Sequence, residues 1–407
     1  MNEHPGVLDP VDVCVVGGAG HVGAPLATVF ATRGFRTLIY DTDPEAVRAI
    51  LGGRFPFVEA GGEPLLREAL ASNLLSGTSE PKDVARARTV VITIGTPVDE
   101  FQNPVWDAVS KCVGDLLPYM SRTSVLILRS TVSPGTTERL QRFLADRGFD
   151  LPVAFCPERV VQGQAIEEIQ HMPQIVSGTS AIAEDRAAEV FGRIASRLVR
   201  MKPLEAEFAK LFCNAYRYIQ FAASNQFFMM AQQAGCDYGR IVAGMKQDYP
   251  RMGGFPGAGL TAGPCLLKDT LQLAAGSNFQ FGLGYAAMHV NEGLPAFIVE
   301  DLRRRFPLAG MTVGILGMAF KAGSDDVRSS LSYKLKKLVK LHARQVLTTD
   351  PYVTGDPELR PVEEVVAASD LLVIATPHRE YASMRIDGKP VIDIWNLRTA
   401  DPATGPA

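Results

Sequence analysis

At 407 residues the chain is too long for one ordinary hydrophobic core, so two or three domains are expected. It is 46% hydrophobic and 21% charged, as soluble globular proteins are, and its formal net charge of -3 gives no basic field for nucleic acid. No run approaches the ~18 apolar residues of a membrane span. The first ten residues lack the features of a signal peptide, so we expect a cytoplasmic protein that binds neither nucleic acid nor membrane. Six scattered cysteines indicate neither a disulfide framework nor a metal site.

The first part of the chain alternates short apolar runs with helical patterns. "VDVCVVG" is strand-like and leads through a glycine turn into a helix expected over residues 25–32. The further strand-like runs are "TLIYD", "TVVITIGTP", "SVLILRST" and "PVAFCPE". Apolar runs of this length between helices predict a parallel sheet covered on both faces.

A long segment, residues 204–234, contains neither proline nor glycine and is followed by Gly235, which suits a helix C-cap. Its sequence is apolar around much of the helix circumference, so we expect burial on more than one side. It could join two domains and pack against its own copy in a dimer.

The third part of the chain resembles the first part in its pattern. Strand-like "MTVGILGMAF", "QVLTTDP", "DLLVIATP" and "PVIDIW" flank an amphipathic helical stretch at residues 329–343. Two related nucleotide-binding folds would explain this likeness, although any two doubly wound domains look alike at this level.

A glycine-rich motif follows the first strand directly. Its glycines allow a tight turn, close approach of a pyrophosphate, and close packing of helix on strand, while the helix N-terminus favours the phosphates. Asp41, at the end of the second strand, suits the 2′-hydroxyl of a ribose and favours NAD over NADP. The expected NAD contacts in this motif are Gly18, Gly20, His21, Val22 and Gly23.

Five other stretches carry residues capable of chemistry. Each residue alone has an ordinary structural explanation, as a core thiol, a helix-start carboxylate or a solvated lysine. The spacing of Lys210 and Asn214 places both on one face of the long helix. The stretches are "RSTVSPGTTE" with Ser130 and Thr131, "CPERVVQG" with Glu158, "EFAKLFCNAY", "GAGLTAGPCLLKDT" with Cys265, Lys268 and Asp269, and "AFKAGSDDVRSS" with Lys321, Asp326 and Arg328.

These motifs, in this order, resemble the UDP-glucose/GDP-mannose dehydrogenase family over residues 11–398. The resemblance implies an α/β fold with two Rossmann-like doubly wound domains, joined by a long central helix and a helical dimerisation region. The implied domains are an NAD-binding domain (residues 1–200), a central helical domain (201–300) and a UDP-sugar-binding domain (301–407). It further implies a homodimer formed through the central helix.

The family resemblance also implies a four-electron oxidation, in which the C6 alcohol of a UDP-sugar becomes a carboxylate using two NAD+. A Cys265 thiolate would hold the intermediate aldehyde as a thiohemiacetal and then as a thioester. Lys210 and Asn214 would stabilise the oxygen on C6, and such donors contribute about 3 kcal/mol each when preorganised. Asp269, and Glu158 through Thr131, would position or activate water.

Further contacts are implied by the same resemblance. The implied cofactor contacts outside the glycine motif and Asp41 are Thr96, Ser130, Thr131, Lys268 and Arg328. The implied substrate contacts are Glu158, Arg159, Val160, Lys210, Asn214, Arg251, Gly259 and Lys321, with Arg251 reaching the substrate of the neighbouring subunit.

The sequence departs from the family pattern at Ala262 and Pro264, just before the thiol, and at Trp395, which could stack on a ligand or pack. The motifs also disagree on the sugar. "CPERVVQG" resembles the branch acting on UDP-N-acetylhexosamines, whereas "CLLKD" resembles the UDP-glucose branch, which we take as the first expectation. The rival hypotheses are a hydroxyacid dehydrogenase that oxidises once and a nucleotide-binding protein without activity.

Overall fold

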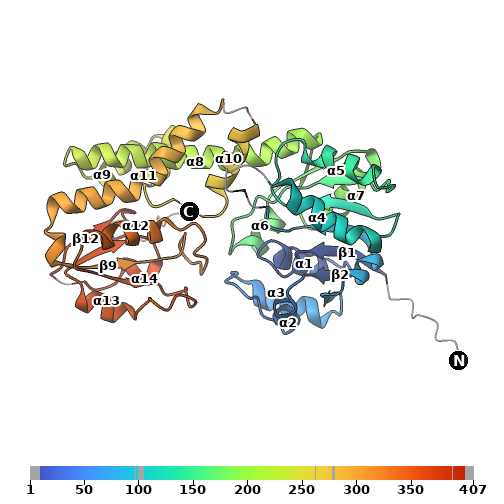
Figure 1. The fold of residues 1–407 in the computed structure, drawn as a ribbon, viewed down its shortest axis with the longest axis horizontal. Coiled ribbons are helices and arrows are strands. Elements are labelled where there is room, and N and C mark those ends of the chain that lie inside the picture. Colours follow the sequence, from blue (N-terminus) through green and yellow to red (C-terminus); the bar gives the residue numbers. More distant parts are fainter. Residues whose placement is uncertain are drawn as a thin grey trace. The chain divides into compact units, whose positions relative to one another are not determined.

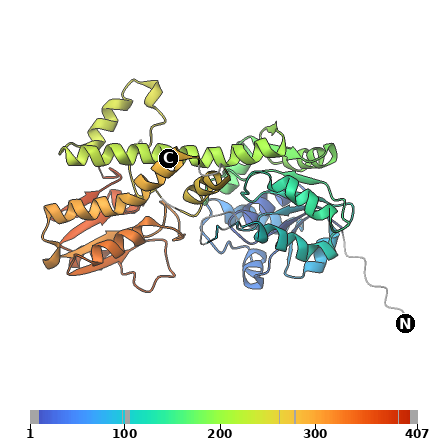
Figure 2. The same cartoon turned by 45° about the horizontal axis from the view of Figure 1, so that its top comes forward.

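The computed structural model describes residues 10–96, 98–99, 105–261, 263–276, 280–386 and 388–398. The chain divides into two compact units, Met1–Phe212 and Cys213–Ala407. The boundary falls inside one long helix, α8 (Pro203–Gln233), drawn in yellow-green in Figures 1 and 2. The expected division into three domains at residues 200 and 300 stays a prediction. Among the described residues, no helix combines the length and the apolar character needed to cross a bilayer.

The first unit contains a large, mainly parallel sheet, which confirms the predicted fold class. Its eight described strands lie in the order β3-β2-β1-β4-β5-β6-β7-β8, and the β6–β7 pair is antiparallel. The strands are β1 (Val11–Val16), β2 (Thr37–Tyr40), β3 (Leu75–Thr78), β4 (Ala87–Ile92), β5 (Val125–Leu128), β6 (Val153–Phe155), β7 (Gln174–Gly178) and β8 (Leu198–Arg200).

Helices cover this sheet on both faces (Figure 1). Val13 and Val15 of β1 belong to one core cluster and Cys14 and Val16 to another, so alternate side chains are buried on opposite faces. The helices are α1 (Gly23–Thr32), α2 (Pro44–Leu51), α3 (Gly62–Ala71), α4 (Trp106–Leu116), α5 (Thr136–Ala145), α6 (Ala165–His171) and α7 (Ala181–Gly192), with 3-10 turns η1 (Pro81–Arg86) and η2 (Leu117–Tyr119).

The strand order reverses beside β1. From β1 the chain builds outward through β2 and β3, and then returns to place β4 on the other side of β1. In open α/β sheets, ligands bind beyond the carboxyl ends of the strands at this switch point. The loops after β1, β2, β4, β5 and β6 carry the predicted cofactor contacts of this unit, together with Thr131 and Glu158.

The second unit contains a smaller, all-parallel sheet in the order β10-β9-β11-β12. Helices α11 and α12 pack on each other beside it (Figure 1). The strands are β9 (Thr312–Leu316), β10 (Gln345–Thr349), β11 (Leu371–Ile374) and β12 (Val391–Asp393), and the helices are α9 (Tyr238–Lys246), α10 (Leu266–Gly276), α11 (Gly282–Arg305), α12 (Leu331–Lys340), α13 (Val362–Ala368) and α14 (Arg379–Ala382), with 3-10 turns η3 (Pro250–Met252) and η4 (Leu308–Gly310).

In both sheets the first strand of the unit is flanked by the next strand in sequence, β1 by β2 and β9 by β10. The aspartates that follow β2 and β10 have different roles. Asp350 follows β10 as Asp41 follows β2. Its Oδ2 accepts hydrogen bonds from the backbone N–H groups of Met318 (2.7 Å) and Ala319 (2.9 Å) and from His378 Nε2 (3.0 Å). The side chains of Asp350 and His378 are 0% exposed. Asp350 therefore ties the loops of the second unit together instead of facing a ligand.

Helix α8 begins one residue earlier than predicted and ends at Gln233, and Gly235 adopts a φ of +68°. The expectation of burial on more than one side holds only in part. In the single chain, α8 exposes large apolar side chains, namely Phe212, Tyr216, Phe227 and Met230.

Candidate active site

The glycine-rich turn after β1 has no room for a side chain at Gly18 or Gly23. A Cβ on Gly18 would lie 2.5 Å from the carbonyl oxygen of Val15, and one on Gly23 would lie 2.3 Å from that of Gly17. Gly17 itself has a φ of +73°, which favours glycine. The glycines thus let the turn fold back tightly and let α1 start close against the sheet, as a pyrophosphate cradle requires.

Asp41 is held at the edge of this turn. Its Oδ2 accepts a hydrogen bond from the backbone N–H of Ala19 (3.0 Å), while its Oδ1 accepts from that of Asp43 (3.2 Å). The side chain stays half-buried, so the carboxylate is oriented yet reachable. The turn, the N-terminus of α1 and Asp41 fit the pyrophosphate and the adenosine ribose of NAD.

His21 and Val22 lie between the glycines at the start of α1. The His21 ring stacks on Phe57, with ring centroids 4.1 Å apart and planes inclined by 19°. Val22 is the N-cap residue of α1 and contributes its backbone at the helix end. Both predicted contacts therefore lie on the turn that would face the phosphates.

The ends of β4 and β5 are fastened to each other. Thr96 Oγ1 donates a hydrogen bond to the carbonyl oxygen of Thr131 (2.6 Å), and Ser130 Oγ donates to that of Ile94 (2.6 Å). Thr93, which the sequence analysis did not single out, donates to the carbonyl oxygen of Val16 (2.7 Å) and so ties β4 to the glycine turn. A hydroxyl at the end of an apolar strand is the signal that could have identified it.

A carboxylate from α8 anchors the loop that follows Thr131. Glu207 accepts hydrogen bonds from the backbone N–H groups of Gly135 (2.5 Å) and Thr137 (2.7 Å) and from Thr137 Oγ1 (2.6 Å). These donors lie at the N-terminus of α5, where a negative charge is favourable. The loop carrying Ser130 and Thr131 is therefore fixed at both ends.

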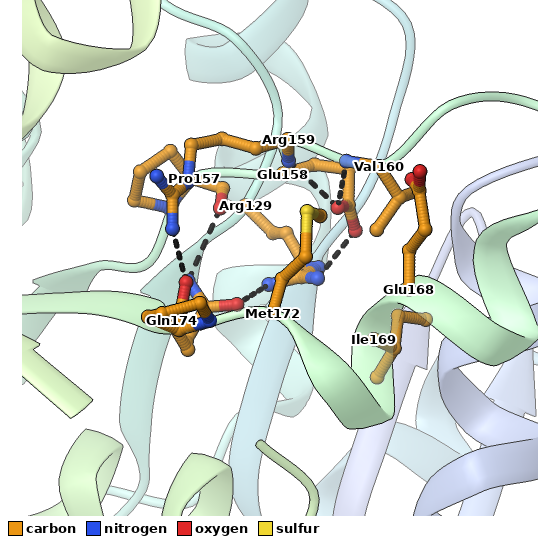
Figure 3. Close-up of a pocket in the computed structure, with 10 residues that line it drawn as sticks. Arg129, Pro157, Glu158, Arg159, Val160, Glu168, Ile169, Met172 and Gln174 are labelled. Atoms are coloured by element: carbon orange, nitrogen blue, oxygen red, sulfur yellow. Dashed lines mark hydrogen bonds and ion pairs between the residues drawn. The ribbon is translucent and has the colours of Figure 1, made fainter. Parts of the chain in front are cut away.

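Glu158, at the end of β6, pairs with Arg129 at the end of β5. Figure 3 shows the two side chains meeting beside Gln174, in a pocket that Arg159, Val160 and five other described residues also line. The predicted link from Glu158 through Thr131 stays a prediction, because the contact that the carboxylate makes here is with Arg129. Sequence reasoning missed Arg129, although an arginine closing the run "VLIL" is an unusual strand end.

Lys210 and Asn214 lie one turn apart on α8, and both are buried. Asn214 Nδ2 donates a hydrogen bond to Asp269 Oδ2 on α10 (2.6 Å). An amide NH2 carries two hydrogens, so Asn214 can hold Asp269 and still present a second N–H. The structure thus brings together two residues that the sequence placed 55 positions apart.

Cys265 lies in the turn that precedes α10, and its thiol is exposed. The backbone N–H of Asp269 donates to the carbonyl oxygen of Cys265 (2.8 Å), and Lys268 Nζ lies 3.4 Å from Asp269 Oδ1. Cys14 and Cys156, in contrast, are fully buried, and burial raises the pKa of the Cys156 thiol to about 12. Cys265 therefore has the solvent exposure that a reactive thiol needs, whereas Cys14 and Cys156 are core residues.

The Cys265 turn rests on the loop after β9. Gly263, with a φ of +104°, donates its N–H to the carbonyl oxygen of Ser329 (3.4 Å), and a Cβ there would lie 2.5 Å from the Phe320 ring. Arg328 forms an ion pair with Asp326 (2.6 Å). The hydrogen bond to Asp326 raises the Arg328 pKa, and a smaller contribution comes from the nearby Cys265.

The other predicted substrate contacts have different surroundings. Lys321 is half-buried in the loop that carries Arg328, and Arg251 is exposed in η3. Gly259 lies under Trp395, whose ring a Cβ at this position would meet at 2.3 Å. The Trp395 indole N–H donates to the carbonyl oxygen of Ala375 (2.9 Å), so this aromatic side chain packs within the second unit. Ala262 lies outside the described residues.

Three sequence profiles of one family match the chain in order. They are the NAD binding domain at residues 11–195, the central domain at 204–293 and the UDP binding domain at 314–400. The chain belongs to the UDP-glucose/GDP-mannose dehydrogenase family. Its cofactor is NAD, which the glycine turn and Asp41 fit.

Relatives in this family match nearly the whole chain. A UDP-N-acetyl-D-mannosamine dehydrogenase of Pyrococcus horikoshii is 30% identical over 379 residues, 90% of each chain. An NDP-N-acetyl-D-galactosaminuronic acid dehydrogenase of Ralstonia nicotianae is 27% identical, over 94% of this chain and 95% of its own length. A solved structure, of a UDP-glucose dehydrogenase from Pyrobaculum islandicum, has a TM-score of 0.87 at 28% identity and covers 98% of this chain and 97% of that one.

Proposed function

We propose that this protein oxidises the C6 alcohol of a UDP-N-acetylhexosamine to the carboxylate, with UDP-N-acetyl-D-mannosamine as the first candidate. The observation that carries the proposal is the exposed Cys265 thiol beside the buried, oriented Asp269. Asn214 and Lys268 hold that carboxylate, so a nucleophile and a polar group able to handle water lie on one helical turn.

The proposed reaction balances as one alcohol, two NAD+ and one water giving one carboxylate, two NADH and three protons. NAD+, held at the glycine turn and Asp41, would supply the hydride acceptor for each of the two oxidations at C6. After the first oxidation the Cys265 sulfur adds to the aldehyde carbon as a thiohemiacetal. The second oxidation converts this adduct into a thioester. Water then cleaves the C–S bond, which releases the carboxylate and restores the thiol.

The residues around the thiol have separate roles in this proposal. Lys210 and the second N–H of Asn214 stabilise the negative oxygen on C6. Asp269 accepts a proton from the alcohol or from water, and the charge of Lys268 favours the thiolate form of Cys265. Glu158, with Thr131, activates the hydrolytic water.

Two observations support an N-acetylated sugar over UDP-glucose, the first expectation from the sequence. The stretch "CPERVVQG", which follows β6 at the carboxyl edge of the sheet, resembles the branch that acts on UDP-N-acetylhexosamines. Both relatives compared by sequence above are named for N-acetylhexosamine derivatives. The stretch "CLLKD" and the Pyrobaculum islandicum structure support the alternative, UDP-glucose. The N-acetyl group is the chemical difference that decides between them.

A substrate panel tests this choice. The purified protein should form NADH with UDP-N-acetyl-D-mannosamine. UDP-glucose, UDP-N-acetylglucosamine, UDP-N-acetylgalactosamine and GDP-mannose should react at rates at least about tenfold lower, because a site shaped around the N-acetyl group of one epimer rejects sugars that lack this group or hold it in another direction. Turnover of UDP-glucose as the best substrate would refute the N-acetylhexosamine proposal and leave the C6 oxidation in place.

We also propose that two copies pair through α8. At about 100° per residue, Phe212, Tyr216, Phe227 and Met230 fall within roughly 60° of one another around the helix. Tyr216 is 63% and Met230 58% exposed, so the helix carries an unburied apolar stripe. A second copy of the same stripe is its natural partner, because such a contact is self-complementary.

Charges placed on this stripe should separate the copies. The double variant Tyr216→Glu, Met230→Glu puts two like charges from each copy into an apolar contact, so it should elute as a monomer where the wild type is a dimer. Light scattering after size-exclusion chromatography measures the mass. Gln233→Glu, outside the stripe on the same helix, is the matched control and should stay dimeric. A wild-type monomer, or a dimeric double variant, would refute the pairing.

A further inference from the structure

We propose that Arg129 is a positioning residue, which compensates the buried charge of the Glu158 carboxylate and fixes its direction for its work on water. This inference rests on the proposed function, because it concerns the activation of water in the last step. It assigns a role to a residue that touches neither substrate nor cofactor in that reaction.

Arg129 is the largest fully buried side chain of the described residues, with 1% exposure. It extends from the end of β5 toward the ends of two other strands. Its Nη1 donates to Gln174 Oε1 (2.9 Å) and to the carbonyl oxygen of Cys156 (3.3 Å), and its Nη2 pairs with Glu158 Oε2. The guanidinium also lies over the Phe191 ring, 5.0 Å from its centroid. The cation is therefore held from several sides.

Gln174 fixes this arginine and is itself fixed. While its Oε1 accepts from Arg129, its Nε2 donates to the carbonyl oxygens of Pro157 (3.1 Å) and Ile175 (2.8 Å). Figure 3 shows the Arg129 guanidinium between the side chains of Gln174 and Glu158. Gln174 cannot rotate without losing its own hydrogen bonds. It therefore fixes the direction in which Nη2 of Arg129 points.

Both oxygens of Glu158 are occupied in a defined way. Oε1 accepts from the backbone N–H groups of Arg159 (2.7 Å) and Val160 (2.9 Å), while Oε2 faces Arg129. All of these donors favour the ionised carboxylate. Each oxygen has more than one lone-pair direction, so a carboxylate oriented this way still has acceptor capacity for a water.

The charge of Arg129 compensates a carboxylate that is only 8% exposed. The other ionisable groups around Glu158 do not compensate its charge. The Arg159 guanidinium donates to the carbonyl oxygen of Pro173, and Glu168 accepts from the backbone N–H of Val161. Cys156 is a buried thiol whose raised pKa keeps it neutral. Removing Arg129 would leave the Glu158 carboxylate buried without its compensating cation.

The alternative is that the pair only stabilises the edge of the sheet. A structural role lowers the amount of folded protein and leaves the kcat and KM of the folded fraction unchanged. A positioning role instead lowers kcat through Glu158, so the effect disappears when Glu158 is replaced by glutamine. These readouts separate the two roles.

The test compares Arg129→Met and Arg129→Lys with the wild type, each alone and combined with Glu158→Gln. At pH 7.5, Arg129→Met should lower kcat about 10²-fold with little change in KM, because Glu158 then lacks the group that orients it towards water. Arg129→Lys, which keeps the charge and loses the fork geometry, should lower kcat about tenfold. Neither variant should lower kcat further in the Glu158→Gln background.

Arg147→Met is the matched control, since this exposed arginine lies over Phe143 in the same unit and makes no contact with Glu158. Equal losses of kcat in the Glu158→Gln background, or an Arg129→Lys variant no more active than Arg129→Met, would overturn the inference. If Arg129→Met does not fold, the Arg129→Lys comparison in the two backgrounds decides. A wild type that forms no NADH with any UDP-sugar refutes the proposed function instead, so the two failures are distinguishable.

Discussion

Replacing Cys265 with serine should abolish carboxylate formation, with a loss of the two-step rate on the order of 10³-fold or more. A serine hydroxyl does not ionise near neutral pH without a general base aimed at it, so it captures the aldehyde poorly. The turn before α10 should keep its shape, because the two side chains are similar in size and Cys265 is exposed. Chromatographic measurement of the UDP-sugar acid formed per minute gives the result.

The control for this substitution is Cys236→Ser, another exposed thiol of the same unit. It should leave the rate unchanged. Full two-step activity in Cys265→Ser would contradict the thioester route, and equal losses in both variants would indicate a general effect of thiol removal.

Replacing Asp350 with asparagine should lower the free energy of unfolding of the second unit by about 3–5 kcal/mol at pH 7. Asp350 accepts from five donors, and an asparagine would turn an NH2 group toward some of them. His378 Nδ1 accepts from the backbone N–H of Gly323 (3.1 Å), so its Nε2 carries the hydrogen donated to Asp350. The loop that carries Lys321 and Arg328 is therefore tied to the same carboxylate.

The effect of Asp350→Asn should shrink in acid. Burial alone would raise the Asp350 pKa, but the hydrogen bond from His378 and the backbone N–H groups of Ala319 and Tyr352 lower it to about 2, from an ordinary 3.8. A depressed carboxyl pKa stabilises the folded state above the ordinary value, and this stabilisation is lost as the pH falls from about 4 towards 2. The wild type should therefore lose more stability than Asp350→Asn between pH 7 and pH 3.

Urea unfolding followed by the fluorescence of Trp395, in a Trp106→Phe background, measures the second unit. Glu363→Gln, an exposed acid in the first turn of α13, is the control and should change stability little. A difference between wild type and Asp350→Asn that stays constant from pH 7 to pH 3 would contradict the assigned role of the Asp350 charge.

The sequence predicts the elements well where one physical signal dominates. Short branched apolar runs such as "VDVCVVG" and "SVLILRST" identify buried parallel strands, and the lack of glycine and proline identifies α8. The glycine turn could be predicted because only glycine fits at Gly18 and Gly23, where a Cβ would clash with backbone atoms.

Contacts between distant segments are what sequence reasoning missed. The burial of Asp350 depends on loops 28 to 32 residues away, after β11 and β9, which the strand pattern of "QVLTTDP" does not reveal. Likewise, the partner of Glu158 is set by which strand ends lie side by side, β5 and β6, and by Gln174 on β7. Periodicity identifies strands but does not order them, so Arg129 emerged only from the structure.

The central claim is that one thiol carries the substrate through two oxidations, and counting the NADH formed per UDP-sugar tests it most directly. With limiting sugar, excess NAD+ and the reaction run to completion, absorbance at the NADH band should give two NADH for each UDP-sugar consumed. One NADH per sugar, with an aldehyde or ketone as the product, would contradict the claim and favour an enzyme that oxidises once.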